Sequence, residues 1–244
     1  MCISWRSQQD LVPSNAVLLC TRTLATRAHI GHATVRHKLR TLGPMSGARL
    51  SRLRTKKDFF FCSPKLLQNI DEIREIDSCL SRVPWREEFV IEIDSKKYTH
   101  QTGYNRAFEV EFQRAGWKLY PLLYDNPRLV GDFLKNDVFV EVQFGNSSTI
   151  YRDYYKFHYG LTHNLLALAV LIVPTNPQKF FPTRPASVNN MAEFDLAQKH
   201  FRLLPIPIPI LLIGLLPENS GTPSGADTNV PPWSSPLDRG HASS

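Results

Sequence analysis

A short apolar segment of the 244-residue chain carries three polar side chains that together could bind a metal ion. Residues 131–145 read GDFLKNDVFVEVQFG, and the three residues are Asp132, Glu141 and Gln143. Successive side chains of a β-strand point to opposite faces, so Glu141 and Gln143 share one face, about 7 Å apart, and the three valines share the other. The valines suit a buried core. The polar pair requires another explanation, because unpaired carboxylates are costly to bury.

Asp132 precedes a predicted hairpin turn at residues 135–137, and this hairpin can bring its carboxylate towards Glu141. Two carboxylates that converge at the edge of a sheet form a hard-oxygen site suited to Mg²⁺. The alternative is an amphipathic hairpin whose outer face is simply polar. The spacing of the residues alone does not separate these two interpretations.

Two further polar residues, Asn105 and Glu109, lie four residues apart on one face of a predicted helix. This face could approach the metal site from behind and support its ligands. A solvated helix face is the alternative explanation for the same spacing.

Basic and aromatic residues near the polar segment are candidates for contact with DNA phosphates. Tyr151, Arg152 and Lys156 follow the predicted metal-binding strand closely in the chain, on a predicted helix. Lys96 and Lys97 lie in a predicted loop before another helix. Exposure on a surface helix or loop would explain these residues as well.

The elements that must position these residues follow from hydrophobic periodicity. The order is helix, strand, helix, strand, a central hairpin, helix, strand, helix, strand, which predicts an α/β domain over residues 58–216 with a mixed central sheet flanked by helices. The predicted helices span residues 63–80, 103–115, 151–163 and 192–203, and the predicted strands span residues 88–94, 117–123, 129–134, 138–144, 165–173 and 206–215.

The net charge of +7 is concentrated at the N-terminal end. Of the 29 basic and 22 acidic residues of the chain, residues 1–57 hold eleven and one, which leaves 18 and 21 for the rest. Residues 1–57 lack sustained periodicity, and three interpretations remain open: a flexible basic arm that contacts DNA, an organelle transit peptide, or translation that begins at Met45. Residues 217–244 are rich in Gly, Pro and Ser, which predicts a disordered tail.

Cysteine usage and hydropathy favour a soluble cytoplasmic protein. The four cysteines show no CxxC spacing, which argues against a zinc site or a disulfide framework and favours a reducing compartment. The apolar run 165–173 is too short to span a bilayer, and the run 203–216 is interrupted by three prolines. We therefore expect no membrane association.

The segment that contains Asp132, Glu141 and Gln143 resembles the PD-(D/E)xK nuclease superfamily, in which an acid ends one strand and an acid-x-lysine follows on the next. More narrowly, it is similar to BglII- and BstYI-type restriction endonucleases, in which glutamine replaces that lysine. FVEVQFG, the preceding helix that stops at Gly116 and the closing apolar strand also match. The resemblance covers residues 64–216. Gly131 departs from it, because the superfamily often has proline there.

The resemblance implies a restriction-endonuclease-like core and a type II enzyme that hydrolyses DNA. Asp132, Glu141 and the Val142 carbonyl would hold Mg²⁺, and Gln143 would orient the attacking water, because a neutral amide does not accept a proton near neutral pH. The substrate would be double-stranded DNA with a short palindromic site, GATC-containing as a first expectation. The working unit would be a homodimer, with a cognate DNA methyltransferase as its genetic partner.

Two other functions remain open from the sequence. The first is a repair or structure-specific nuclease of the same superfamily, which would cleave without a fixed site. The second is a catalytically silent DNA-binding protein. The presence of Asp132, Glu141 and Gln143 together argues against the silent protein.

Overall fold

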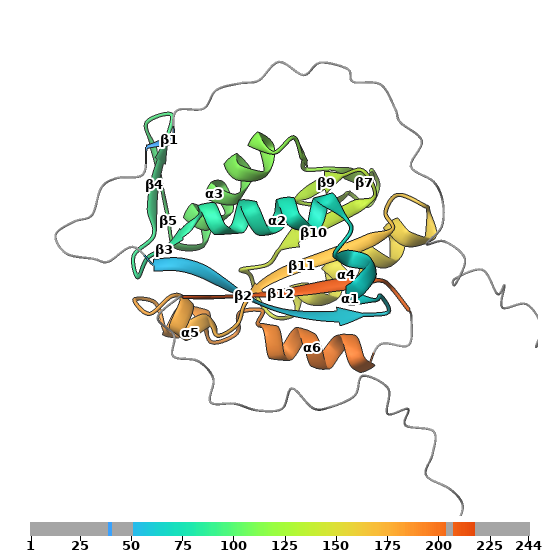
Figure 1. Ribbon diagram of the computed structural model, residues 1–244. Coiled ribbons are helices and arrows are strands. Elements are labelled where there is room, and N and C mark those ends of the chain that lie inside the picture. The colour runs from blue at the N-terminus through green and yellow to red at the C-terminus, as the bar shows by residue number, and fades with distance from the viewer. Residues whose placement is uncertain (1–38, 41–50, 204–206, 218–244) are drawn as a thin grey trace, which may run out of the picture. The chain divides into compact units, whose positions relative to one another are not determined.

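The computed structural model describes residues 39–40, 51–203 and 207–217 (Figure 1). Every described residue lies within one compact unit, residues 37–244. Most of the predicted basic arm and the predicted disordered tail therefore lie outside the described residues. Among the described residues, no helix combines the length and the apolar character needed to cross a membrane.

The centre of the fold is a seven-stranded mixed sheet in the order β3-β2-β12-β11-β10-β9-β6. Strands β10, β11 and β12 are parallel to one another, whereas β2 pairs antiparallel with β12 and β9 pairs antiparallel with β10. The predicted mixed sheet is thus confirmed. Its strands are β2 (Ser51–Phe60), β3 (Pro84–Trp85), β6 (Lys118–Leu119), β9 (Phe133–Lys135), β10 (Val138–Val142), β11 (Leu168–Pro174) and β12 (Ile210–Pro217).

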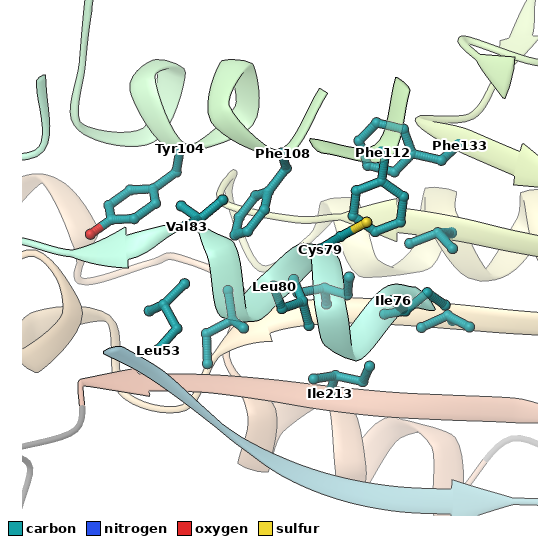
Figure 2. Close-up of a cluster of buried hydrophobic side chains, with 14 of the residues drawn as sticks. Leu53, Ile76, Cys79, Leu80, Val83, Tyr104, Phe108, Phe112, Phe133 and Ile213 are labelled. Carbon is teal, nitrogen blue, oxygen red and sulfur yellow. The ribbon is translucent and has the colours of Figure 1, made fainter. Parts of the chain in front are cut away.

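Helices cover both faces of this sheet because the central strands are apolar on both sides. One face packs against α2 (Asp71–Arg82) and α3 (His100–Arg114), and the other against α4 (Thr149–Thr162) and α6 (Phe194–Leu203) (Figure 1). Figure 2 shows α2 lying between α3 and the sheet, with buried side chains of both helices directed at one another. This core includes Ile76, Cys79 and Leu80 from α2, Tyr104, Phe108 and Phe112 from α3, and Ile213 from β12.

Smaller elements complete the described part of the chain. A three-stranded sheet and a two-stranded sheet accompany the main one. They comprise β1 (Leu39–Arg40), β4 (Val90–Ile93) and β5 (Lys96–Thr99), and β7 (Leu122–Tyr124) and β8 (Leu129–Val130), respectively; the short helices are α1 (Pro64–Leu67), α5 (Pro177–Phe180) and the 3₁₀ helix η2 (Ala186–Val188).

Several predicted elements are interrupted in the structure. The helix predicted over 63–80 is two helices, because Ile70 is extended between them. The strand predicted over 117–123 breaks where Tyr120 has φ 51° and is followed by proline. The strand predicted over 129–134 breaks at Gly131 and Asp132. Residues 96–97, predicted as a loop, lie in β5, which pairs with β4.

The N-terminal limit of the sheet differs from the predicted boundary at residue 58. Strand β2 begins at Ser51 and pairs with β12 from Leu53 to Phe60. Only one side of its first half is buried, at Ser51 and Leu53, while Arg52 and Arg54 are exposed. Residues 51–57 therefore belong to the sheet. Their many basic side chains made this half-buried strand difficult to recognise from the sequence.

Candidate active site

Strand alternation directs the polar side chains of β10 towards helix α4. The Phe139 ring lies edge-on to Phe157 of α4, with 5.9 Å between the ring centroids. Glu141 is two residues further along β10 and therefore shares this face. It is only 3% exposed, although the segment that carries it resembles an amphipathic hairpin.

Asp132 lies at the break between β8 and β9, where the chain leaves the ladder beside β10. Its Oδ2 accepts a hydrogen bond from the backbone N–H of Val142 at 2.7 Å, which ties the carboxylate to the neighbouring strand. Loss of hydration raises the pKa of Asp132 to about 6, against the opposing effect of that hydrogen bond. Because the strand is interrupted here, the Val142 N–H is hydrogen-bonded to the carboxylate of Asp132.

The two oxygens of Glu141 have different surroundings. Oε2 lies 2.9 Å from the ammonium of Lys156. Oε1 is buried and has no hydrogen-bond partner. Burial, followed by repulsion from Asp132 and Asp153, raises the pKa of Glu141 well above its ordinary value. A buried carboxylate oxygen without a donor is costly, so an external ligand at Oε1 would be favourable.

Gln143 is held at both ends of its amide. Its Nε2 donates to Oδ2 of Asp153 at 2.6 Å, and its Oε1 accepts from the backbone N–H of Gly145 at 2.8 Å. A Cβ on residue 145 would lie 2.6 Å from this Oε1, so glycine is needed there for the amide to fold back. One N–H and one acceptor lone pair of Gln143 remain for other partners.

Helix α4 contributes a buried ion pair that the sequence analysis did not assign to the site. Asp153 and Lys156 are 0% and 5% exposed, and the ammonium of Lys156 lies 3.0 Å from Asp153 Oδ1. Burial would lower the pKa of Lys156, but the carboxylates of Glu141 and Asp153 raise it, so the lysine is protonated. Both interpretations of Lys156 from the sequence, contact with DNA phosphates and a place on a surface helix, require an exposed side chain, and its burial contradicts them.

A sequence signal for this pair existed but was not used. On a helical wheel, Asp153 falls among Ile150, Phe157 and Gly160, all of which are buried. A charged residue on the apolar stripe of a helix indicates either a buried ion pair or a site.

A pocket of about 170 Å³ opens beside Asp132. Asn105 and Glu109 of α3 line it, so this face of the helix lies next to Asp132. The remaining lining residues are Tyr120, Phe133 and Val142. Glu109 is also paired with Arg106 on the same helix.

The other predicted DNA-contacting residues lie outside this cluster. Lys96 and Lys97 are exposed on β5, and Tyr151 and Arg152 are exposed in the first turn of α4. Helix α4 therefore presents Asp153 and Lys156 to the sheet and Tyr151 and Arg152 to solvent.

Comparison with known proteins shows the family. A family model described as restriction endonuclease BglII/BglIII matches residues 62–215, which is more than half of the chain. This chain belongs to the BglII/BglIII restriction endonuclease family. Membership of this restriction endonuclease family implies a DNA-cleaving enzyme. No curated protein matches the sequence.

A solved structure shares the fold of this restriction endonuclease. It is the crystal structure of restriction endonuclease BglII complexed with a DNA 16-mer, with a TM-score of 0.52 and 19% sequence identity. The similarity covers 66% of this chain and 75% of that chain. The restriction-endonuclease-like architecture expected from the sequence is thus confirmed.

The polar cluster of this restriction endonuclease fits a hard divalent cation. The described residues contain no group of three or more His, Cys, Asp and Glu side chains that could hold a metal. Asp132 and Glu141 nevertheless offer carboxylate oxygens, and Oε1 of Glu141 is buried without a donor. Mg²⁺ commonly uses one or two carboxylates and keeps several waters, so a pair of acids is sufficient.

Proposed function

We propose that this restriction endonuclease hydrolyses DNA phosphodiester bonds with Mg²⁺ held by Asp132, Glu141 and the Val142 carbonyl. The observation that supports the proposal is the unpartnered, buried Oε1 of Glu141. A Cβ on Gly131 would lie 3.1 Å from this oxygen, so the oxygen faces the segment that carries Asp132. Two raised carboxyl pKa values at one place are typical of a site that gains stability from a cation.

When bound, the cation would polarise the scissile phosphate and lower the pKa of an attacking water. Asp132 and Glu141 supply the negative charge that holds it. Gln143 orients the water through its remaining N–H or lone pair, and it does not take the proton, because a neutral amide is not a base near neutral pH. The proton passes to solvent or to a phosphate oxygen.

The substrate in this proposal is double-stranded DNA with a short palindromic site, GATC-containing as a first candidate. A homodimer would match the twofold symmetry of such a site, with each subunit cutting one strand. The exposed Lys96, Lys97, Tyr151 and Arg152 are candidates for contact with backbone phosphates. A DNA methyltransferase that protects the host site would be the genetic partner.

Digestion of unmethylated phage DNA by the purified protein tests this function. Discrete Mg²⁺-dependent fragments with one common end sequence would establish a site-specific enzyme and reveal its site. Structure-dependent cutting without a fixed site would favour a repair nuclease. Binding of DNA without any cleavage would favour the silent binding protein.

Neutral replacement of either proposed ligand should abolish Mg²⁺-dependent cleavage. We expect Asp132→Asn and Glu141→Gln each to lower kcat at least about 1000-fold, equivalent to about 4 kcal/mol of transition-state stabilisation. The exposed Glu88→Gln serves as a matched control and should cleave as the unmodified enzyme does. Retention of full activity in Asp132→Asn or Glu141→Gln would refute the assignment of that residue as a ligand.

A further inference from the structure

A continuous chain of buried polar contacts joins β10 to α4. Glu141 Oε2 contacts Lys156 at 2.9 Å, and Lys156 contacts Asp153 Oδ1 at 3.0 Å. Asp153 Oδ2 in turn accepts from Gln143 Nε2 at 2.6 Å, and Gln143 Oε1 accepts from Gly145 at 2.8 Å. Both polar side chains of the proposed catalytic strand are therefore held by one pair of residues on α4.

Burying the charged side chains of this series of contacts costs free energy, so their arrangement requires an explanation. Removing one partner of a buried ion pair leaves an uncompensated charge in an apolar environment. Among the described residues, Lys156 makes the only ion pair to Glu141. Asp153, which is fully buried, satisfies Lys156 with one oxygen and Gln143 with the other.

The ammonium of Lys156 also gives the two oxygens of Glu141 different roles. It occupies Oε2 and leaves Oε1 without a partner. A cation that uses Oε1 therefore meets a carboxylate whose rotamer is already set, which is how a preorganised site lowers the cost of assembly. The same ammonium repels that cation, because both are positive and share one carboxylate.

We propose that Lys156 is a positioning residue of the nuclease site, which holds Glu141 with Oε1 available to the cation, and that Asp153 fixes both Lys156 and Gln143. This inference rests on the proposed function, since it assigns a role towards Mg²⁺ and DNA cleavage. In the metal-free protein Lys156 is the counter-charge of Glu141. In the protein with Mg²⁺ bound, Lys156 holds the Glu141 carboxylate in position, while its positive charge repels the cation.

Thermal unfolding of the full chain without DNA tests the charge relation. Lys156→Met should lower the Tm in metal-free buffer, because Glu141 loses its partner. Saturating Mg²⁺ should then raise the Tm by at least about 2 °C more than in the unmodified protein, because the cation replaces the missing charge and meets no ammonium. An equal Mg²⁺ effect on both proteins would overturn the proposal.

Lys135→Met is the matched control for this experiment. Lys135 is the last residue of β9, and its ammonium is paired with Glu75 of α2 at 2.6 Å rather than with Asp132 or Glu141. Its replacement also removes a lysine from an ion pair, but the Mg²⁺ effect on the Tm should equal that of the unmodified protein. A larger Mg²⁺ effect in this control would show that the gain in Lys156→Met is not specific, and it would overturn the inference.

Cleavage kinetics test the positioning role separately. Lys156→Met should lower kcat at least about 100-fold while the Kd for DNA in metal-free buffer stays within about threefold. Asp153→Asn, which does not alter a proposed metal ligand, should also lower kcat. The loss in the double variant should be smaller than the product of the two single losses, because the residues act through one chain.

Two results would count against the positioning role: activity of Lys156→Met within about threefold of the unmodified enzyme, or single losses that multiply in the double variant. If Lys156→Met does not fold, the kcat of Asp153→Asn alone decides, and an unchanged kcat would refute the positioning role. The proposed function fails by a different result, namely no Mg²⁺ effect on the Tm and no cleavage in the unmodified protein.

Discussion

The carboxylates of the candidate site reduce the stability of the metal-free protein. Asp132 and Glu141 both have raised pKa values, chiefly through loss of hydration, although Lys156 is close enough to lower both. One ammonium is shared among three acids, namely these two and Asp153. The site therefore has an excess of negative charge, which suits a divalent cation and opposes folding in its absence.

This cost predicts a pH-dependent gain in stability on replacing Asp132 with asparagine. The pKa rises from 3.8 to about 6 on folding, so the folded state binds the proton more tightly than the unfolded state. The corresponding stability is present below pH 3.8 and is lost as the pH rises through about 6. In metal-free buffer, Asp132→Asn should be more stable than the unmodified protein by up to about 3 kcal/mol near neutral pH, with almost no difference at about pH 3.

Urea unfolding at the two pH values measures this difference. Asparagine keeps the oxygen that accepts from the Val142 N–H, so the hydrogen bond between the strands is retained. Saturating Mg²⁺ should abolish the advantage of the variant, because the cation stabilises only the carboxylate. A variant that is less stable at both pH values would show that ionised Asp132 stabilises the fold.

At the scale of elements, the break between β8 and β9 depends on close packing of glycine against an aromatic ring. A Cβ on Gly131 would lie 2.2 Å from Cε2 and Cζ of Phe139. Phe139 is fully buried and packs edge-on against Phe157, so its ring cannot easily move away. The superfamily often has proline at the position of Gly131. Glycine is required in this protein because Phe139 fills the space that a larger residue would need.

Gly131→Ala should therefore destabilise the protein by about 2 kcal/mol and lower cleavage, because relief of the clash shifts the segment that carries Asp132. Adding Phe139→Leu should recover part of both losses by making room for the new methyl group. Denaturant unfolding and initial cleavage rates of the single and double variants measure the effect. An unchanged Gly131→Ala protein would show that Phe139 makes room for the new methyl group without cost.

At the scale of the whole molecule, strand β2 connects the N-terminal part of the domain to its last strand. It pairs with β12 along residues 53–60 and buries Leu53 in the core shared by α2 and α3. Without β2, the backbone of β12 would become an edge of the sheet with unpaired groups and apolar side chains on both faces.

Two truncations separate the strand from the residues before it. A chain that begins at Met45 keeps β2 whole and loses only the two-residue edge strand β1 of the small sheet, so it should retain its Tm within about 2 °C. A chain that begins at Asp58 loses most of β2 and should aggregate or melt far lower. Thermal scans of both proteins beside the full chain are sufficient. A large loss of Tm in the Met45 protein would show that β1 and the residues around it contribute substantially to the stability of the domain.

The sequence by itself determined the properties that depend on local alternation. The period of two in VFVEV placed Glu141 and Phe139 on one face of a strand, and the apolar runs predicted the strands β11 and β12, although not their parallel pairing. Glu141 and Gln143 were singled out because polar groups in an apolar strand are conspicuous, but only the resemblance to the nuclease family favoured a metal site over a polar hairpin face. Helical spacing grouped Asn105 and Glu109 on one face but left open whether this face is solvated or approaches the site, and the structure places both at the pocket beside Asp132.

Only the tertiary structure decided which distant residues meet these side chains. Lys156 was expected on the surface, because a lysine near exposed Tyr151 and Arg152 gives no local sign of burial. It is buried because α4 packs against the very face of β10 that carries Glu141. Strand β2 was missed for a related reason: its basic residues face outward, and the partner that makes it a strand lies at least 150 residues away in β12. Ion pairs and strand pairing depend on contacts between segments, and a local pattern contains no information about them.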